Sequence, residues 1–472
     1  MRMSMYLVLG LMPIAGWSQA QPPSPVAPVL VPAADDDPLL GTLIQEALAR
    51  NPDLGQARTL VQADQERVPQ AGALPDPTLS LGIQNDGFKK LQIGEMETSY
   101  YQVMLTQPLP WPGKRALRSA VAQLGAQVSE AAVGRTRLTL EADVRRAYTG
   151  LLLVRSQLRL LQDQALLLQQ AEATARSRYE VGQGAQADLL RAQLERTRLE
   201  QTRARLRAEE RASQGQLNRL RGLGPDQAIP TQRTLEQLPD PLPTGPDFLA
   251  RAQADSPELL GARLGTQQAQ RSLDLARLER HPDFSVSAGV MPRGALEPMW
   301  TASVGITLPL WQKHKQKRAV AEQEYRQTAS GFAVEQVRCL LEQRIQERSS
   351  DLQASLAVIQ LYRSGLLVQS ESTLKATLAQ YTVGRVPFLS VLEAMNGWIA
   401  DQSGLLQAQA QAQATRIAQM ELTLGPTPAI GASALSGGGM GATSGGGGSS
   451  PAASGAAKPA GAASSSSSSG SM

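Results

Sequence analysis

The stretch "SRYEVGQGAQADLLRA", residues 177–192, returns further along the chain as "AQYTVGRVPFLSVLEA", residues 379–394. The two stretches align without a gap. Each contains the motif Tyr-x-Val-Gly, followed six positions after the glycine by a short polar residue, Asp188 or Ser390. A glycine with positive φ can end a helix, and a short polar side chain can cap the start of the next one. Each stretch therefore predicts a tight turn between two helices.

The repeated turn belongs to a duplication that covers most of the chain. "ALARNPDL" has a counterpart in "AQADSPEL", "LPDPTLSLGI" in "RHPDFSVSAGV", and "VMLTQPLPW" in "VGITLPLW", and the order is the same in both halves. A Gly/Ser/Ala-rich end follows, which we expect to be disordered. The predicted segments are a signal peptide (1–20), a first copy (38–223), a Pro-rich linker (224–245), a second copy (246–425) and the tail (426–472).

The first twenty residues have the pattern of a secretory signal. Arg2 precedes a short apolar run, and "SQA" supplies small residues for cleavage, so we expect the mature chain to begin near Gln21. The alternative, a membrane anchor, is not favoured because the apolar run is too short to span a bilayer. The only cysteine, Cys339, cannot form an internal disulfide, and we expect it to fill a buried or half-buried position in a helix.

Four stretches alternate apolar residues with small polar residues or glycine. They are residues 77–86, 100–107, 283–290 and 301–308, two in each copy. Strands of about 9–11 residues with this alternation are typical of barrels that cross a bilayer. The alternative is a soluble two-stranded hairpin in each copy, which would be marginal in water without a partner surface.

Long helices follow each pair of predicted strands. The first copy is expected to have helices from Gly113 to about Ser177 and from Asp188 to about Leu220, and the second from Lys313 to about Gln380 and from Ser390 to Leu424. The first of these contains a heptad seam, which predicts a coiled coil that packs laterally against other helices. The seam residues are Val144, Ala147, Leu151, Val154, Leu158, Leu161, Ala165 and Leu168.

The order of "LPDPTLSLG", "QPLPWPGKR" and the two Tyr-x-Val-Gly turns, together with the signal segment, strands and helical hairpins, resembles the TolC-type outer-membrane efflux protein family over residues 39–425. "LPDP" with "QPLPWPGKR" is similar to the branch that serves heavy-metal efflux pumps of the resistance-nodulation-division (RND) class. The resemblance implies an outer-membrane channel of a tripartite efflux system. Such a channel is a passive duct that carries metal ions or small toxic molecules outward from an inner-membrane RND-type pump and a periplasmic adaptor protein.

The implied fold is mostly α with membrane β: a trimeric 12-stranded β-barrel, with four strands from each chain, continued in the periplasm by a long α-helical coiled-coil barrel. The strand count leads to the same oligomer. Four strands cannot close a barrel, and eight strands from two chains would enclose an interior filled by side chains. Twelve strands from three chains would leave a passage.

Aromatic and basic residues occur where each pair of strands gives way to a helix. Trp111 and Trp311 suit a membrane interface. The cations that follow them are Lys114, Arg115, Lys313 and Lys315. Because cations at a helix N-terminus oppose the helix dipole, another interaction must favour them. We expect contacts with lipid phosphates at the periplasmic rim; the alternative is a solvated run of charges.

The turns carry the functional residues that the resemblance implies. In the family such Val-Gly tips contact the hairpins of the adaptor, which assigns docking to Val181, Gly182, Val383 and Gly384. The family's periplasmic gate often carries acidic residues in a motif like "VDVLDA". The matching stretch here is "LSVLEA", in which Glu393 is the second acid and Ser390 replaces the first, while Asp188 supplies an acid in the first copy. Three Glu393 side chains around a narrow lumen would attract cations; the alternative is an ordinary exposed glutamate.

Other function classes find little support in the sequence. The two histidines, His281 and His314, have no partners at ligand spacing, and no catalytic motif stands out, so we expect neither an enzyme nor a metal or cofactor site. The formal charge of +4 is interleaved along the helices without a basic cluster, which does not favour nucleic acid. A periplasmic adaptor or a structural coiled-coil protein remains as the alternative function, although a lipoyl-like β domain is not visible.

Overall fold

A computed structural model describes residues 37–231, 233–241, 248–422 and 424–425, so the predicted signal segment and tail lie outside the described residues. The first half contains α1 (Pro38–Arg50), α2 (Pro52–Gly72), β1 (Thr78–Gln84), β2 (Tyr100–Leu109), α3 (Lys114–Glu180), α4 (Gln186–Leu220) and the 3₁₀ turn η1 (Leu235–Gln237). The second half contains α5 (Phe248–Asp255), α6 (Pro257–Leu278), β3 (Asp283–Arg293), β4 (Leu296–Thr307), α7 (Gln316–Leu361), the π-helical turn η2 (Tyr362–Leu366), α8 (Leu367–Thr382) and α9 (Phe388–Glu421). The order helix, helix, strand, strand, long helix, long helix occurs in both halves.

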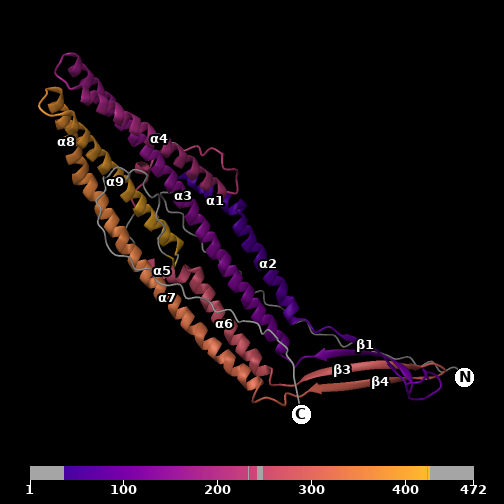
Figure 1. Cartoon of the computed structure of the whole chain (residues 1–472). Coiled ribbons are helices and arrows are strands. Elements are labelled where there is room, and N and C mark those ends of the chain that lie inside the picture. Colours follow the sequence, from indigo (N-terminus) through magenta and orange to yellow (C-terminus); the bar gives the residue numbers. More distant parts are fainter. Residues whose placement is uncertain (1–36, 232, 242–247, 423, 426–472) are drawn as a thin grey trace, which may run out of the picture. The chain divides into compact units, whose positions relative to one another are not determined.

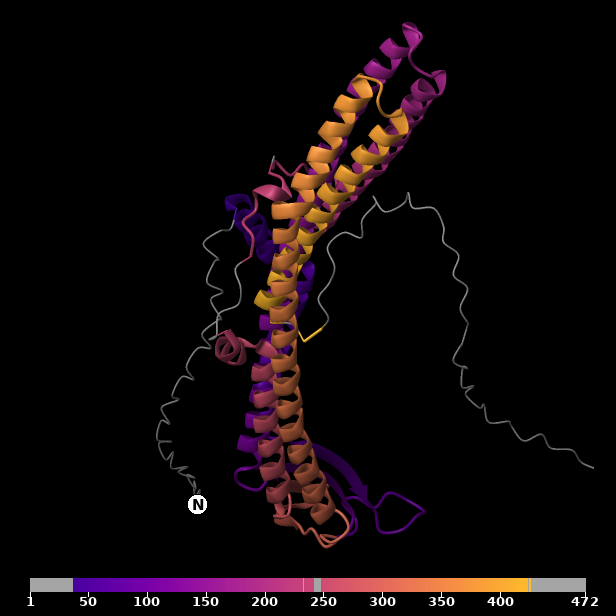
Figure 2. The same cartoon turned by 90° about the vertical axis from the view of Figure 1, so that its left-hand side faces the viewer.

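Four helices lie side by side at each level of the helical part (Figures 1 and 2). Next to the sheet the order is α2, α3, α6, α7, and toward the two turns it is α4, α3, α9, α8. The helix α3 is long enough to take part in both sets. Each set forms a layer one helix thick, and each of its two outer helices packs against one other helix of the same set.

The heptad seam of α3 forms the centre of this packing. Val144 and Leu151 are buried in a core shared with α1, α4 and α9, and Leu161 and Leu168 in a second core shared with α4, α8 and α9. Of the predicted seam residues, Ala165 is exposed. The repeat "QAQAQAQA" in the last long helix lies within α9 as predicted, because Ala and Gln favour helix in spite of their alternation.

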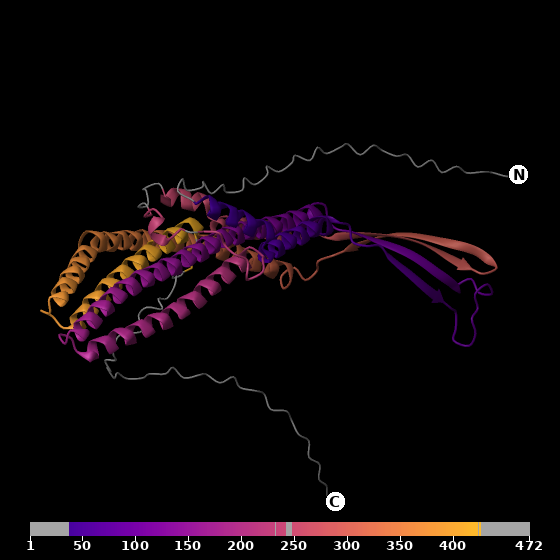
Figure 3. The same cartoon turned by 90° about the horizontal axis from the view of Figure 1, so that it is seen from above.

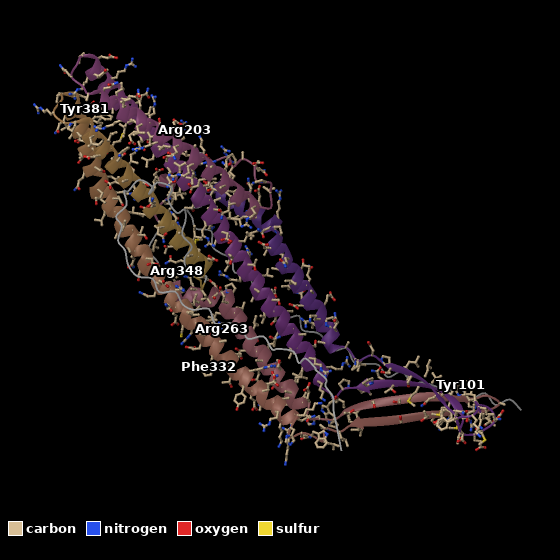
Figure 4. All side chains as sticks on the ribbon, viewed as in Figure 1. Tyr101, Arg203, Arg263, Phe332, Arg348 and Tyr381 are labelled. Atoms are coloured by element: carbon tan, nitrogen blue, oxygen red, sulfur yellow. The ribbon has the colours of Figure 1, made fainter. Side chains whose placement is uncertain are left out.

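Arginines fix the C-terminal end of α9. Glu421 is almost fully buried, where it accepts hydrogen bonds from Arg135 and Arg146 of α3 at 2.8 Å and 2.7 Å. Arg348 of α7 (Figure 4) donates to the carbonyl of Ala418 at 3.0 Å. Burial lowers the pKa of Arg348, an effect that the nearby Glu421 carboxylate opposes. Cations at a helix C-terminus also complement the helix dipole. These contacts attach the end of the second copy to α3 and α7.

The four strands form one antiparallel sheet in the order β1-β2-β3-β4. Its register places Leu79, Leu105, Ala288 and Ala302 in one row across the sheet, and Thr78, Thr106, Ser287 and Ser303 in the next. Successive rows face opposite sides of a sheet, so one face is apolar and the other small and polar. In Figure 3 no helix of the described chain covers either face, and most large apolar side chains of the sheet are exposed.

Three local predictions differ from the structure. The helix predicted over residues 313–380 is interrupted by the π-helical turn η2, where the Tyr362 ring lies against Gly404, a position without a side chain. Cys339, expected to be at least half buried, is exposed on α7. The helices α4 and α9 begin two residues before the predicted caps. No helix in the described part of the chain is long and apolar enough to cross a membrane.

Candidate functional site

The two Tyr-x-Val-Gly turns lie next to each other at the end of the helices farthest from the sheet (Figure 1). Gly182 has φ 75° and Gly384 has φ 80°, as predicted for glycines that end a helix. Both turns close with the same pair of backbone hydrogen bonds. In each turn the glycine N–H donates to the tyrosine carbonyl, and the N–H of the residue after the glycine donates to the carbonyl of the residue before the tyrosine. The adjacent Val181 and Val383 are 66% and 68% exposed. Two apolar side chains therefore project from neighbouring tips.

The residues predicted as helix caps have another place in the structure. The N-cap of α4 is Ala185 and that of α9 is Pro387, and neither makes a side-chain capping bond. Asp188 and Ser390 instead lie in the first helical turn, where an acidic side chain still complements the helix dipole. The prediction failed because each turn closes in fewer residues than the sequence spacing suggested.

The three predicted gate residues lie near the tips but do not meet within one chain. Asp188 forms a 3.7 Å ion pair with Arg191 on its own helix. Glu393 is exposed and Ser390 is half-buried. Burial raises the pKa of Tyr381 at the second tip, and the negative charge of Asp188 adds to this rise. An acidic ring would require Glu393 side chains from several copies of the chain, so this prediction stays open.

Arg178 connects the two tips and was missed in the sequence. Its guanidinium donates to the carbonyl of Tyr381 at 2.5 Å and to the carbonyl of Gln183 at 3.2 Å. It also lies over the Tyr381 ring, 4.9 Å from the centroid (Figure 4 labels Tyr381). The corresponding residue of the second copy is Gln380. This difference between otherwise matching turns was the signal available in the sequence, because only the arginine can make a charged contact to the other tip.

The sheet-to-helix junction of the first copy forms a compact contact, which we call the clasp. It consists of Trp111, Lys114, His281 and Asp283. The Asp283 carboxylate accepts from the Trp111 backbone N–H at 2.7 Å and from the Lys114 ammonium at 2.8 Å, and Lys114 also donates to the His281 carbonyl at 3.0 Å. The Trp111 ring stacks on His281 and Phe284. The clasp therefore ties the first copy to the second.

The clasp changes the interpretation of one predicted lipid contact. The Lys114 side chain is only 3% exposed, and Asp283 supplies the favourable partner that the sequence left unidentified. Lys114 is therefore not proposed to contact lipid phosphates. Arg115 is exposed and donates to the Gly72 carbonyl at 2.8 Å. Its contact with lipid stays a prediction.

The junction of the second copy has the same residue types without the partners. Trp311 is 75% exposed. Lys313 and Lys315 are also exposed, and neither ammonium has an acidic partner among the described residues. No cluster of three or more His, Cys, Asp or Glu residues in the described part of the chain has the arrangement of a metal site.

The sequence model of the outer membrane efflux protein family matches residues 43–223 and 248–423, one segment in each half of the chain. The chain belongs to the outer membrane efflux protein family. The predicted TolC-type resemblance and the outer-membrane location are thereby confirmed, and the apolar face of the four-stranded sheet agrees with that location.

Solved structures show the same fold for this efflux protein. The outer-membrane channel OprN is 18% identical with a TM-score of 0.70, over 82% of this chain and 90% of that one. CusC, described for its transmembrane channel formation, is 21% identical with a TM-score of 0.66, over 82% and 91%. The open outer membrane channel MtrE of Neisseria gonorrhoeae is 20% identical with a TM-score of 0.68, over 82% and 89%. A search among curated protein sequences finds no significant match.

Proposed function

We propose that three copies of this efflux protein join edge to edge into a closed tube, which serves as the exit duct of a tripartite efflux system. The observation that carries this proposal is the open layer. At every level the layer ends on the same two sides, on β1, α2 and α4 at the first edge and on β4, α7 and α8 at the second edge. A layer with two matching open edges along its whole length is suited to closure by further copies of itself.

Exposed apolar side chains along both edges support this closure. The first edge carries Leu60 on α2 and Leu190 on α4, and the second carries Phe332 on α7 (Figure 4) and Val368 on α8, all more than half exposed. Strand edges also present unpaired backbone groups that need a partner in a membrane. Three copies of the four-stranded sheet would supply twelve strands, enough to leave a passage inside.

The neighbouring tips support a connection to the rest of a pump. In a trimer, three pairs of tips would surround the periplasmic mouth, with Val181 and Val383 available to a partner. We expect a periplasmic adaptor to dock there and an inner-membrane RND-type pump to supply the cargo, either metal ions or small toxic molecules. The duct itself would be passive and without catalysis.

The assembly is tested by purifying the protein from the outer-membrane fraction and measuring its native mass in detergent. The expected result is a trimer that resists SDS without heating. A monomer in the periplasmic fraction would overturn the proposal and favour the adaptor or structural alternative. Transport is tested by restoring efflux in a host that lacks its own duct.

The docking role is tested with Gly182→Trp combined with Gly384→Trp. Positive φ strains any side chain at these positions, and the bulky rings would also distort the tips. We expect loss of adaptor binding and of efflux while the trimer persists. Normal efflux by the double variant would contradict docking at the tips, and the native mass of the same preparation is the control for assembly.

The gate is tested by single-channel conductance with and without divalent cations in the Glu393→Gln variant. A ring of three carboxylates should bind these cations, so the variant should lose their block. Glu371→Gln is the matched control, because Glu371 is another exposed acid near the tip, paired with Lys375 at 2.5 Å. Equal block in all three proteins would remove Glu393 from the gate.

A further inference from the structure

Several residues at the junction between β2 and β3 have counterparts at the two open edges of the sheet. On the β2 side, "VMLT" (103–106) matches "VGIT" (304–307) of β4, and on the β3 side "DFSVSAGV" (283–290) matches "DPTLSLGI" (76–83) at β1. The contact between β2 and β3 is made inside the chain. The corresponding contact between β4 and β1 would need a second copy.

We propose that β4 of one copy pairs with β1 of the next in the register that β2 and β3 already use, and that a second clasp locks this seam. The inference rests on the proposed trimer and goes beyond it by naming the residues that meet. Within the chain Val103 pairs with Val290 and Thr106 with Ser287. Replacing each residue by its counterpart pairs Val304 with Ile83 and Thr307 with Ser80 of the neighbouring copy.

The hydroxyl pair supports this register. Thr106 and Ser287 are half-buried, with their hydroxyl oxygens 2.9 Å apart. Their counterparts Thr307 and Ser80 are both exposed at opposite edges of the same sheet. The seam would bring these two hydroxyl groups to the same distance on the small, polar face.

Gly82 gives independent support for this register, because no contact within the described part of its own chain requires a glycine there. A Cβ at Gly289 would lie 2.8 Å from the Val103 carbonyl oxygen, so β2 excludes any side chain there. At the counterpart, Gly82, a Cβ would meet only the Gln102 side chain, at ordinary contact distances. The proposed seam places Gly82 against the carbonyl of Val304 from the next copy, which excludes a side chain for the same reason.

The charges at the seam are complementary. Asp76, the counterpart of Asp283, is exposed and has no partner among the described residues. Trp311, the counterpart of Trp111, has a backbone N–H without an acceptor in the described part of the chain. Lys313 and Lys315 flank the position that corresponds to Lys114. The second clasp therefore joins the Trp311 N–H and these two lysines to Asp76 of the next copy, which replaces the lipid contact predicted for them.

The register is tested by cysteine cross-linking in the full-length protein, in a Cys339→Ser background because Cys339 is exposed. Ser80→Cys with Thr307→Cys should form disulfides between copies under mild oxidation, giving covalent dimers and trimers on a denaturing gel without reductant. Each single variant should run as a monomer on the same gel.

Two matched pairs complete the experiment. Thr106→Cys with Ser287→Cys should cross-link within one chain, which shows that the hydroxyl-pair geometry permits a disulfide. Ser80→Cys with Ser303→Cys keeps the same face of the sheet but lies four residues out of register, so it should give no product between copies. The native mass of every variant is measured before oxidation.

The outcomes separate the inference from the proposed function. Cross-links from the Ser303 pair instead of the Thr307 pair, or a trimer in which neither pair reacts, would overturn the register and leave the duct proposal intact. A monomeric native mass would overturn both. For the clasp, Asp76→Lys should abolish SDS-resistant trimers, and adding Lys313→Asp and Lys315→Asp should restore them; failure of the charge exchange to restore them would overturn the second clasp.

Discussion

The two sheet-to-helix junctions contain the same kinds of residue in different surroundings. Trp111 and Lys114 are packed against the second copy through Asp283, whereas Trp311 and the lysines that follow it are exposed. Both junctions descend from one repeated sequence unit, so the difference does not lie in residue type. It lies in whether the chain itself supplies the partner strand.

In a duplicated chain, each exposed residue can therefore be compared with its counterpart in the other copy. Where one copy buries a residue and the other exposes its counterpart, the exposed position is a candidate subunit contact. Gly289 and Gly82 show the same contrast as the two junctions. Substitutions at such matched positions should therefore affect folding of the chain at the internal junction and trimer formation at the open edges.

The largest effect is expected from Gly289→Val. Its Cβ would overlap the Val103 carbonyl oxygen, so β2 and β3 could not pair, and we expect no folded protein in the outer membrane. Gly82→Val is the matched variant. It should leave the chain folded and prevent trimer formation, which native mass and membrane fractionation would show. Equal behaviour of the two variants would remove the contrast between the internal junction and the edge.

A smaller effect is expected from Asp283→Ala, which leaves the buried Lys114 ammonium without its carboxylate. Asp283 is partly exposed, so the effect is smaller than for a fully buried ion pair. We expect the free energy of unfolding to fall by about 2 kcal/mol. The measurement is denaturant unfolding of the detergent-solubilised protein. Asp76→Ala should change folding of the single chain by less than about 0.5 kcal/mol and instead weaken the trimer.

The contact between the tips is tested by Arg178→Ala. Loss of the charged hydrogen bond to the Tyr381 carbonyl should speed amide hydrogen exchange around residues 379–386 by roughly tenfold, since such bonds contribute about 1.5 kcal/mol. Arg176→Ala is the control, because Arg176 pairs with Glu180 on its own helix. Faster exchange in both variants would indicate general fraying of the tips.

The smallest effect concerns the titration of Tyr381. Burial and the Asp188 carboxylate raise its pKa, so the neutral phenol is favoured in the folded protein. The associated stability is present below the ordinary value of about 10 and is lost as the pH rises through the higher folded value. Asp188→Asn should lower the pKa of Tyr381. Phenolate absorbance, with Tyr381→Phe as the blank, measures the shift, and an unchanged titration would separate Asp188 from the second tip.

Much of the fold was predictable because its signals are local and periodic. Alternation over residues 100–107 and 301–308 predicted strands, and heptad spacing in α3 predicted the buried Leu151 and Leu161. The positive φ of Gly182 and Gly384 followed from their place in the turn motif. The helix caps were misplaced by three residues, because spacing alone does not define how tightly a turn closes.

The tertiary structure decided which residues have partners. In the sequence Lys114 belongs to a basic run. Only the pairing of β3 with β2 showed that Asp283 forms an ion pair with it. Arg178 likewise acquires its role from a tip some two hundred residues away, a separation that no local pattern covers. Periodicity determines which face of a helix or strand is apolar, whereas the partner of a charge depends on which elements the folded chain brings together.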